Sequence, residues 1–253
     1  MDEEVRALAS QPLNLSTSQP LNQMLSAIIV AAGSSQRMGF DKLLALLGDR
    51  PVLAHTLDAF EQTSCVDEVI LVARAERVTE FRELVQQGAF KKVRDVFAGG
   101  EQLQDSVRAG LERLGPGATY VAVHDAARPL VTPDQIERVF ALARQHGAAA
   151  LAEPITNTLK RADENRFVTG GVAREGLYAM QTPQIFSREL LVDAYAAVAE
   201  KSLSITDEVS AVELLGAKVV LVPHDELNLK ITYPRDLSLA QSFLSRRTNS
   251  ASL

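Results

Sequence analysis

An apolar run followed at once by a glycine-rich, cationic loop constrains this chain more than any other stretch. The run, residues 27–32, is too short for a helix and rich in β-branched side chains, which predicts a strand buried on both faces. The loop after it holds Gly33, Arg37, Gly39 and Lys42. Backbone N–H groups of such a loop can surround a phosphate while the cations neutralise it, so we expect a triphosphate to bind here.

The loop matches neither of two familiar phosphate-binding patterns. It lacks the Gly-Lys-Ser/Thr ending of a P-loop, and Gly33 and Gly39 do not have the spacing of the dinucleotide fingerprint. The missing fingerprint argues against a dinucleotide-dependent oxidoreductase. The alternative interpretation is an ordinary strand-to-helix turn, in which the glycines serve geometry and the cations are solvated.

Strand-like and helix-like segments alternate along the rest of the chain. Strands are expected at 68–73, 91–97, 120–123, 148–152, 218–222 and 229–232, and helices at 52–62, 76–86, 103–114, 133–145 and 187–201, from Asp207 and from Pro234. Such alternation with short connections is typical of an α/β fold, in which helices cover both faces of a mostly parallel sheet.

One segment, at about 154–183, departs from this rhythm and shows no helical period. We predict paired strands forming a β-arm, which cannot bury its own faces and therefore packs on a second subunit. Residues 25–247, with this arm, are expected to form a single domain. Residues 1–24 are interpreted as a disordered leader and residues 248–253 as a polar tail.

Composition excludes several classes of protein. A net charge of −6 argues against a broad nucleic-acid surface, and no apolar run approaches the ~20 residues of a membrane-spanning helix. The single Cys65 excludes an internal disulfide framework and a cysteine-based zinc site, and we interpret it as a structural residue. Because residues 1–24 fit neither a secretory signal nor a basic transit peptide, we expect a cytoplasmic protein.

Asp125 follows a predicted strand, within the sequence His-Asp-Ala-Ala-Arg. Open α/β sheets place their ligands at the carboxyl ends of such strands. Because Mg²⁺ usually takes one or two carboxylates plus substrate phosphates, we predict that Asp125 holds Mg²⁺ or another divalent cation. The alternative is that Asp125 caps a turn and pairs with Arg128.

A second glycine pair, Gly99-Gly100, follows another predicted strand and precedes Glu101 and Ser106. Glycines let the backbone approach a planar base closely, and a polar side chain can bind its edge. A helix-start loop is the alternative, and the two interpretations are compatible.

Two cations far apart in sequence, Arg174 and Lys230, lie in short polar or strand-like segments and could converge on one anion. Asp207 and Glu208 resemble a pair of active-site acids. However, acids in a first helical turn are also favoured by the helix dipole, and capping is the interpretation that we prefer for them.

The motifs occur in a fixed order. They are Ala31-Ala32-Gly33 through Arg37 to Lys42, Pro51-Val52-Leu53, His124 through Pro129, Gln181-Thr182-Pro183-Gln184, Thr206-Asp207-Glu208, and Asn228-Leu229-Lys230-Ile231-Thr232. As a set, covering residues 25–244, they closely resemble the 2-C-methyl-D-erythritol 4-phosphate cytidylyltransferases of the non-mevalonate isoprenoid pathway.

This resemblance implies a Rossmann-like nucleotidyltransferase fold with a β-arm exchanged across a homodimer. It implies that CTP and methylerythritol phosphate react, with Mg²⁺, to give the CDP-alcohol and pyrophosphate. By position, it implies that Arg37, Lys42, Arg174 and Lys230 act in catalysis, that Ala31, Ala32, Gly33, Gly100, Glu101 and Ser106 surround the nucleotide, and that Asp125, Arg128, Thr158, Arg174 and Lys230 hold the second substrate. Because the attacking phosphate oxygen is already anionic, such a site needs no general base.

The chain departs from the family's pattern at two positions. Leu103 stands where the family commonly has arginine, and Asn157 stands where an aspartate commonly precedes the arm threonine. Two alternatives remain open: a cytidylyltransferase acting on another polyol phosphate, such as ribitol 5-phosphate, and a catalytically silent nucleotide-binding protein on the same fold.

Overall fold

The computed structural model describes residues 23–33, 38–100 and 102–250. Within it, side chains are described up to residue 247. The leader predicted at 1–24 therefore lies almost wholly outside the described residues, as do two predicted site residues, Arg37 and Glu101.

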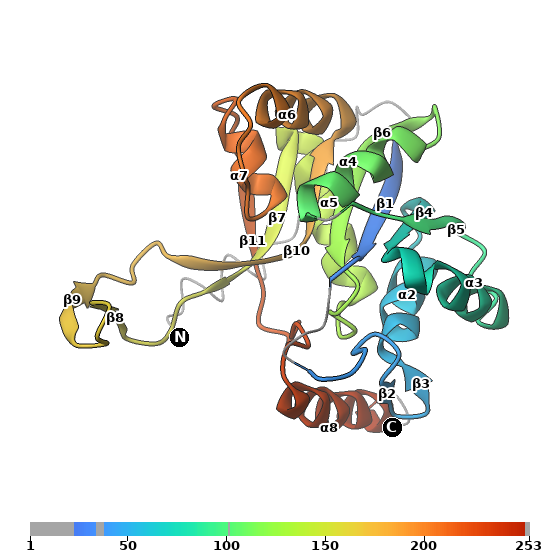
Figure 1. Cartoon of the computed structure of the whole chain (residues 1–253), viewed down its shortest axis with the longest axis horizontal. Helices are drawn as coiled ribbons and strands as arrows, with labels where there is room; N and C mark the ends of the chain where they lie inside the picture. Colours follow the sequence, from blue (N-terminus) through green and yellow to red (C-terminus); the bar gives the residue numbers. More distant parts are fainter. Residues whose placement is uncertain (1–22, 34–37, 101, 251–253) are drawn as a thin grey trace.

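A seven-stranded sheet forms the centre of the molecule, and its strands lie in the order β11-β7-β10-β6-β1-β4-β5 (Figure 1). Its members are β1 (Met24–Ala31), β4 (Val66–Ala73), β5 (Val93–Ala98), β6 (Ala118–Asp125), β7 (Ala148–Pro154), β10 (Tyr178–Ser187) and β11 (Val220–Pro223). Every pairing is parallel except those of β10, which runs antiparallel to both β6 and β7. The prediction of a mostly parallel sheet is confirmed.

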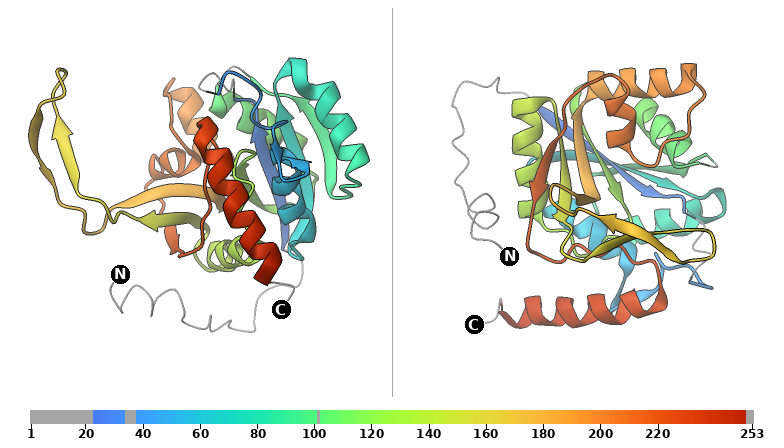
Figure 2. Two further views of the ribbon diagram at one scale, coloured as in Figure 1. Left: turned by 90° about the horizontal axis from the view of Figure 1, so that it is seen from below. Right: turned by 90° about the vertical axis from the view of Figure 1, so that its left-hand side faces the viewer.

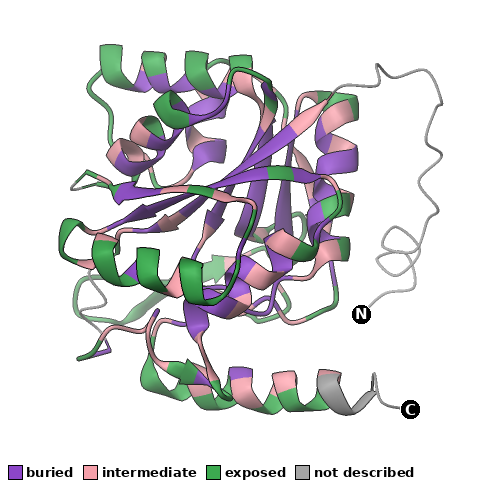
Figure 3. Cartoon of the chain, turned by 90° about the vertical axis from the view of Figure 1, so that its right-hand side faces the viewer, coloured by how far each residue is buried: buried purple, intermediate pink, exposed green. Residues whose placement is uncertain are grey.

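Helices cover both faces of this sheet. Their bounds are α2 (Val52–Gln62), the short 3-10 helix η1 (Ala75–Arg77), α3 (Val78–Gln87), α4 (Leu103–Arg113), α5 (Pro133–His146), α6 (Arg188–Glu200), α7 (Glu208–Glu213) and α8 (Pro234–Ser250). Two separate apolar cores result, one including α2, α3 and α5 and the other including α4, α6 and α7. Buried residues concentrate in the strands, while the outward faces of the helices are exposed (Figure 3). Among the described helices, none is both long and apolar enough to cross a membrane.

The central strand β1 contributes to both cores, because successive side chains of a strand point to opposite faces. Ala27 and Ile29 pack in the core that contains α2, whereas Ile28 packs in the core that contains α4. The prediction of a strand buried on both faces is thus confirmed, and β1 delivers the following glycine-rich loop to the carboxyl edge of the sheet.

The segment between β7 and β10 leaves the body of the protein as an arm (Figure 2). Its end is a two-stranded antiparallel sheet of β8 (Leu159–Ala162) and β9 (Val168–Val172). The large apolar side chains of Phe167 and Val168 at this end are 72% and 66% exposed. The predicted β-arm is therefore present, and it presents apolar surface to its surroundings.

Three local predictions meet different outcomes. Thr132 caps α5 by accepting from the Gln135 N–H, and Pro133 lies at the start of the helix, as predicted. The prediction of a short strand at 229–232 is wrong, because these residues form no backbone hydrogen-bond ladder with another strand. The sequence also failed to predict the part of β10 that occupies the sheet between β6 and β7. A small hairpin of β2 (Leu46–Leu47) and β3 (Arg50–Pro51) precedes α2.

Candidate active site

Four parallel strands, β1, β4, β5 and β6, end at the same edge of the sheet, and backbone hydrogen bonds join the loops that follow them. The Ala126 N–H donates to the Val30 carbonyl at 3.0 Å, which joins the end of β6 to β1. The Gly99 N–H donates to the Ala73 carbonyl at 2.8 Å, which joins the end of β5 to β4. The loops predicted to bind phosphate, base and metal are thereby brought to one edge.

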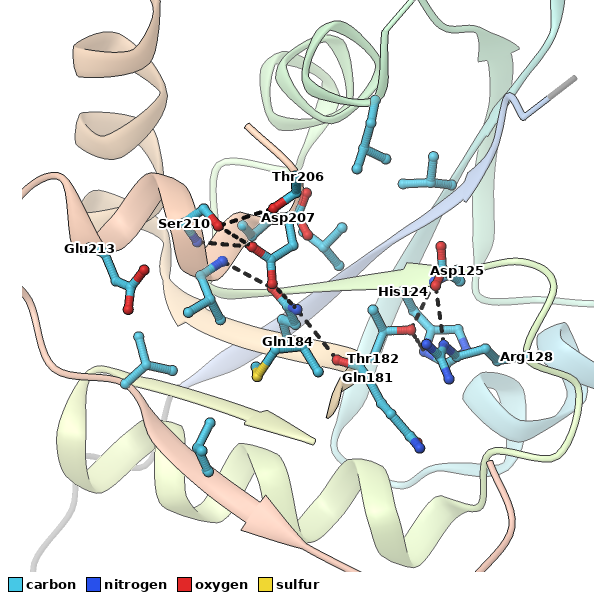
Figure 4. A pocket seen from close by; sticks show the side chains of 18 of the residues that line it. His124, Asp125, Arg128, Gln181, Thr182, Gln184, Thr206, Asp207, Ser210 and Glu213 are labelled. Atoms are coloured by element: carbon cyan, nitrogen blue, oxygen red, sulfur yellow. Dashed lines mark hydrogen bonds and ion pairs between the residues drawn. The ribbon is translucent and has the colours of Figure 1, made fainter. Parts of the chain in front are cut away.

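Asp125, the last residue of β6, lies between two cations. Its Oδ1 accepts from Lys230 Nζ at 2.9 Å, and its Oδ2 accepts from Arg128 Nε at 3.1 Å. Figure 4 shows Arg128 beside Asp125. The pairing with Arg128 that the alternative interpretation described is therefore present, and Lys230, from a distant part of the chain, binds the same carboxylate.

The two cations also decide the ionisation of Asp125. Burial alone would raise the pKa of its carboxyl, but the positive charges of Lys230 and Arg128 outweigh burial and lower that pKa. Asp125 is therefore an anion at neutral pH, able to bind cations or to accept hydrogen bonds from hydroxyl groups.

Lys42, from the loop after β1, contacts the segment that carries Lys230. Its Nζ donates to the Ile231 carbonyl at 2.8 Å, and the Ile231 N–H in turn donates to the Ala127 carbonyl at 2.8 Å. Lys42 therefore contacts the residue next to Lys230, although the two lysines are far apart in sequence. Two cations, Arg128 and Lys230, therefore bind the Asp125 carboxylate, and Lys42 binds the residue next to Lys230.

Thr182 and His124 form a hydrogen-bonded chain that fixes the backbone of Asp125. The Asp125 N–H donates to Thr182 Oγ1 at 3.1 Å, and this hydroxyl lies 3.0 Å from His124 Nδ1. Burial lowers the pKa of His124 to about 3, so its ring is neutral. The sequence showed both residues within motifs but gave neither a role.

The segment that carries Lys230 is held by side chains in place of a strand ladder. Asn228 Nδ2 donates to Gln181 Oε1 at 3.0 Å and to the Thr182 carbonyl at 2.8 Å. Arg128 Nη1 donates to the Asn228 carbonyl at 2.8 Å. The sequence analysis included Asn228 and Gln181 in motifs but gave neither a role, since buried amides give no hydrophobic pattern.

A cavity of about 830 Å³ opens beside Asp125 (Figure 4). Its lining includes Asp125, Arg128 and Lys230, the acids Asp207 and Glu208, and Leu103. The cavity thus presents charges of both signs beside apolar side chains, and it can take a ligand that carries both phosphate and hydroxyl groups.

Asp207 and Glu208 differ in role. Asp207 caps α7, because its Oδ1 accepts from the Ser210 N–H at 3.0 Å, and the preferred capping interpretation is confirmed for it. Glu208 is buried and accepts from the Tyr195 hydroxyl at 3.1 Å. Burial raises the pKa of Glu208 to about 7, and the negative charges of Asp125 and Asp207 add to the increase. Glu208 is thus partly protonated near neutral pH.

The described residues that were predicted to bind the nucleotide do not line this cavity, and they lie at or after the end of β1, after β5 and in α4. Ala31 is buried, Ala32 is half-buried, and Gly33 and Gly100 are exposed. Ser106 is fully buried under Gly99, where an added Cβ would overlap the Ser106 hydroxyl. Gly99 is therefore needed for this close approach.

Two predicted substrate ligands, Thr158 and Arg174, lie in the arm, and neither lines the cavity of its own chain. Arg174 donates to the Thr156 carbonyl within the arm. The arm leaves the sheet and extends away from the body of the protein (Figures 1 and 2). The structure thus brings Lys42, Asp125, Arg128 and Lys230 together and leaves Thr158 and Arg174 apart from them.

Within the described part of the chain, no three His, Cys, Asp or Glu residues cluster as a metal site. A divalent cation would therefore rest on a single carboxylate plus oxygens of the substrate, a mode that Mg²⁺ commonly adopts. Asp125 fits this mode. Each of its carboxylate oxygens accepts one hydrogen bond from a cationic side chain and keeps a further lone pair for a metal ion. Burial raises the pKa of the Cys65 thiol to about 11, which disfavours the thiolate form that binds metals.

Comparison with known proteins gives consistent matches. The model of a family described as 2-C-methyl-D-erythritol 4-phosphate cytidylyltransferase matches residues 25–246. A protein of that name from Desulforamulus reducens is 42% identical over 224 residues, which are 87% of this chain and 96% of the relative.

Solved structures agree in fold. The 4-diphosphocytidyl-2C-methyl-D-erythritol synthase of Anaerococcus prevotii matches with a TM-score of 0.78 at 29% identity, covering 88% of this chain and 97% of that one. The 2-C-methyl-D-erythritol 4-phosphate cytidylyltransferase of Thermus thermophilus matches with a TM-score of 0.73 at 32% identity, covering 87% and 98%.

Proposed function

The chain belongs to the 2-C-methyl-D-erythritol 4-phosphate cytidylyltransferase family, and we propose that its reaction takes place around Asp125. The protein is a nucleotidyltransferase, which transfers the cytidylyl group of CTP to 2-C-methyl-D-erythritol 4-phosphate. The products are 4-diphosphocytidyl-2-C-methyl-D-erythritol and pyrophosphate. The observation that carries the assignment of the site is the pairing of Asp125 with Arg128 and Lys230, with Lys42 bound to the carbonyl of the neighbouring Ile231.

The chemistry suits a site made of cations. An oxygen of the methylerythritol phosphate attacks the α-phosphorus of CTP in line, a new P–O bond forms, and the bond to the β-phosphate breaks to release pyrophosphate. Negative charge increases on the departing pyrophosphate, and Lys42, with Arg37 of the same loop, would stabilise it. Lys230 and Arg128 would hold the attacking phosphate, with Asp125 accepting from the hydroxyl groups of the alcohol.

Cytidylyltransferases generally use a divalent metal, and Asp125 is the residue that would hold it here. When bound, Mg²⁺ neutralises charge on the phosphates and orients them. Because the pKa of Asp125 is lowered, its carboxylate needs no deprotonation before it binds a cation.

The arm would complete the site of a second subunit. Thr158 and Arg174 lie too far along the arm to line their own cavity, and the arm carries the exposed Phe167 and Val168. A two-stranded arm with exposed apolar residues is stabilised when it packs on another molecule. We therefore propose a homodimer in which each arm offers Arg174 to the phosphate of the partner's substrate.

The test is release of pyrophosphate from purified protein with CTP and Mg²⁺, with methylerythritol phosphate and ribitol 5-phosphate offered in separate reactions. We expect turnover with methylerythritol phosphate alone. Turnover only with ribitol 5-phosphate would keep the mechanism and change the substrate, whereas no turnover with either would favour a silent nucleotide-binding protein.

A further inference from the structure

Asp41, directly before Lys42, forms ion pairs with two arginines that follow β4. Its Oδ2 accepts from Arg74 Nη2 at 2.7 Å and lies 2.9 Å from Arg77 Nε. Arg74 follows β4, and Arg77 ends η1. The Asp41 side chain is only 6% exposed, so its carboxylate is well shielded from solvent.

The same aspartate orders the turn that carries Lys42. Asp41 Oδ1 accepts from the Leu43 N–H at 3.1 Å, and the Asp41 carbonyl accepts from the Ala45 N–H at 3.2 Å. The ammonium of Lys42 is bound to the Ile231 carbonyl at 2.8 Å. Lys42 is thus held at both ends, its backbone through Asp41 and its Nζ beside the segment of Lys230.

A simple turn cap explains only part of this arrangement. The Leu43 N–H needs one acceptor oxygen, which a neutral asparagine would supply equally well. A charge-assisted hydrogen bond from Arg74 and an ion pair with Arg77 on one shielded carboxylate make a stronger restraint than a neutral turn cap. The arginines also offset a negative charge that would otherwise repel a triphosphate next to Lys42.

We propose that Asp41, anchored by Arg74 and Arg77, is a positioning residue that holds Lys42 against the triphosphate. This inference rests on the proposed function, since Asp41 acts only through Lys42 and touches no substrate itself. A misplacement of about 1 Å can reduce a rate by ~10²-fold. Loss of Asp41 therefore lowers kcat while the KM for methylerythritol phosphate changes little.

A double-mutant cycle tests the proposal, with kcat and both KM values measured for wild type, Asp41→Ala, Lys42→Met and the double variant. We expect Asp41→Ala to lower kcat by roughly tenfold and Lys42→Met by on the order of 10² to 10³. The double variant should match Lys42→Met within a factor of about 2, because Asp41 has nothing left to position.

Different failures have different meanings. A double variant in which the two losses multiply would overturn the proposal, since Asp41 would then act independently of Lys42. Lys42→Met with a near wild-type kcat would instead contradict the role of Lys42 in the proposed function.

Further variants separate the anchor from the turn cap. Asp41→Asn keeps an acceptor for the Leu43 N–H and loses the ion pairs, so its kcat should lie between those of wild type and Asp41→Ala. Arg74→Gln, which leaves the turn intact, serves where Asp41→Ala does not fold. As a matched control, Asp95→Asn breaks a 2.8 Å pair with Arg113 and should leave kcat unchanged. Wild-type kcat in both Asp41→Ala and Arg74→Gln would refute the proposal.

Discussion

At the scale of single residues, Asp125 shows how one carboxylate can serve several partners. Lys230 and Arg128 each take one of its oxygens, and Thr182 fixes its backbone N–H. Removal of its charge would leave two cations beside each other without a counter-ion. A substitution of Asp125 is therefore expected to affect both the binding of a metal ion and the position of the two cations.

Asp125→Asn should raise the Mg²⁺ concentration needed for half-maximal turnover by at least about tenfold and lower kcat, because an amide binds a divalent cation less well than a carboxylate. Initial rates of pyrophosphate release over a Mg²⁺ titration measure both effects. The exposed Asp134, whose nearest cation lies 4.0 Å away, supplies a control in Asp134→Asn. An unchanged Mg²⁺ dependence in Asp125→Asn would leave Asp125 only as the partner of the two cations.

Glu208 makes stability depend on pH. Burial raises its pKa from 4.5 to about 7, so the folded state retains a proton that the unfolded state releases. Stability is therefore lost as pH rises from 4.5 to 7, by roughly 3 kcal/mol when the window has been crossed. Glu208→Gln cannot ionise and still offers Oε1 to the Tyr195 hydroxyl, so its Tm relative to wild type should rise between pH 5 and pH 8. A Tm difference that is the same at both pH values would show that Glu208 does not titrate in this range.

At the scale of elements, the segment from Asn228 to Thr232 is the part of the site with the least regular backbone. Asn228 is buried, and its amide bridges Gln181 and the Thr182 carbonyl. Ile231 is fixed by its N–H to Ala127 and by its carbonyl to Lys42. The position of Lys230 therefore depends on contacts from three other segments.

Asn228→Ala should cost about 1–3 kcal/mol of unfolding free energy, because the buried Thr182 carbonyl loses its donor. Since Lys230 lies two residues away, the KM for methylerythritol phosphate should also increase. Urea unfolding and steady-state kinetics measure the two effects. Ser242→Ala, which removes an exposed helix hydrogen bond, should change stability by less than about 0.5 kcal/mol. Wild-type stability and KM in Asn228→Ala would exclude its role in holding Lys230.

The elements also show what the sequence could and could not predict. A hydrophobic run predicted β1, a helix-start signal predicted α5, and the absence of a helical period predicted the arm, because each of these depends on local sequence. The core part of β10 was missed because Gln184 is buried through hydrogen bonds to Gln181, Asp207 and the Val209 N–H, which no apolar pattern reveals. The prediction of a strand at 229–232 was wrong because the apolar residues of this segment pack against the core without pairing with a strand.

The candidate site could be predicted in part for the same reason. Asp125 and Lys42 follow buried strands, so the position of each was expected from the sheet edge. The contact of Lys42 with the segment of Lys230 joins residues 189 positions apart, and nothing local in the sequence specifies it. Arg37 and Glu101 lie outside the described residues, and their roles stay predictions.

At the scale of the whole molecule, the arm separates two sets of predicted substrate ligands. Lys42, Asp125 and Lys230 belong to the body, whereas Thr158 and Arg174 belong to the arm. A complete site would then take residues from two chains, which gives a direct test in mixed dimers.

Arg174→Ala and Lys42→Met should each be nearly inactive alone, and a mixture of the two should regain activity after subunits exchange. In a mixed dimer, one site combines the intact Lys42 of one chain with the intact Arg174 of the other. With random exchange of equal amounts, roughly a quarter of all sites would be complete. Pyrophosphate release before and after exchange measures the gain, and exchange of each variant with itself is the control. A mixture that stays inactive although mixed dimers form would place Arg174 in the site of its own chain.

The arm is also continuous with the centre of the sheet. β7 and β10 pair along the arm from Pro154 and Tyr178 and again within the sheet, with an irregularity between Met180 and Gln184. In mechanical terms the arm is a cantilever, clamped by strands that pair inside the sheet. Thr182, which holds the Asp125 N–H, lies at the clamp. A force on the tip of the arm would therefore act on Thr182 and, through it, on the backbone of Asp125.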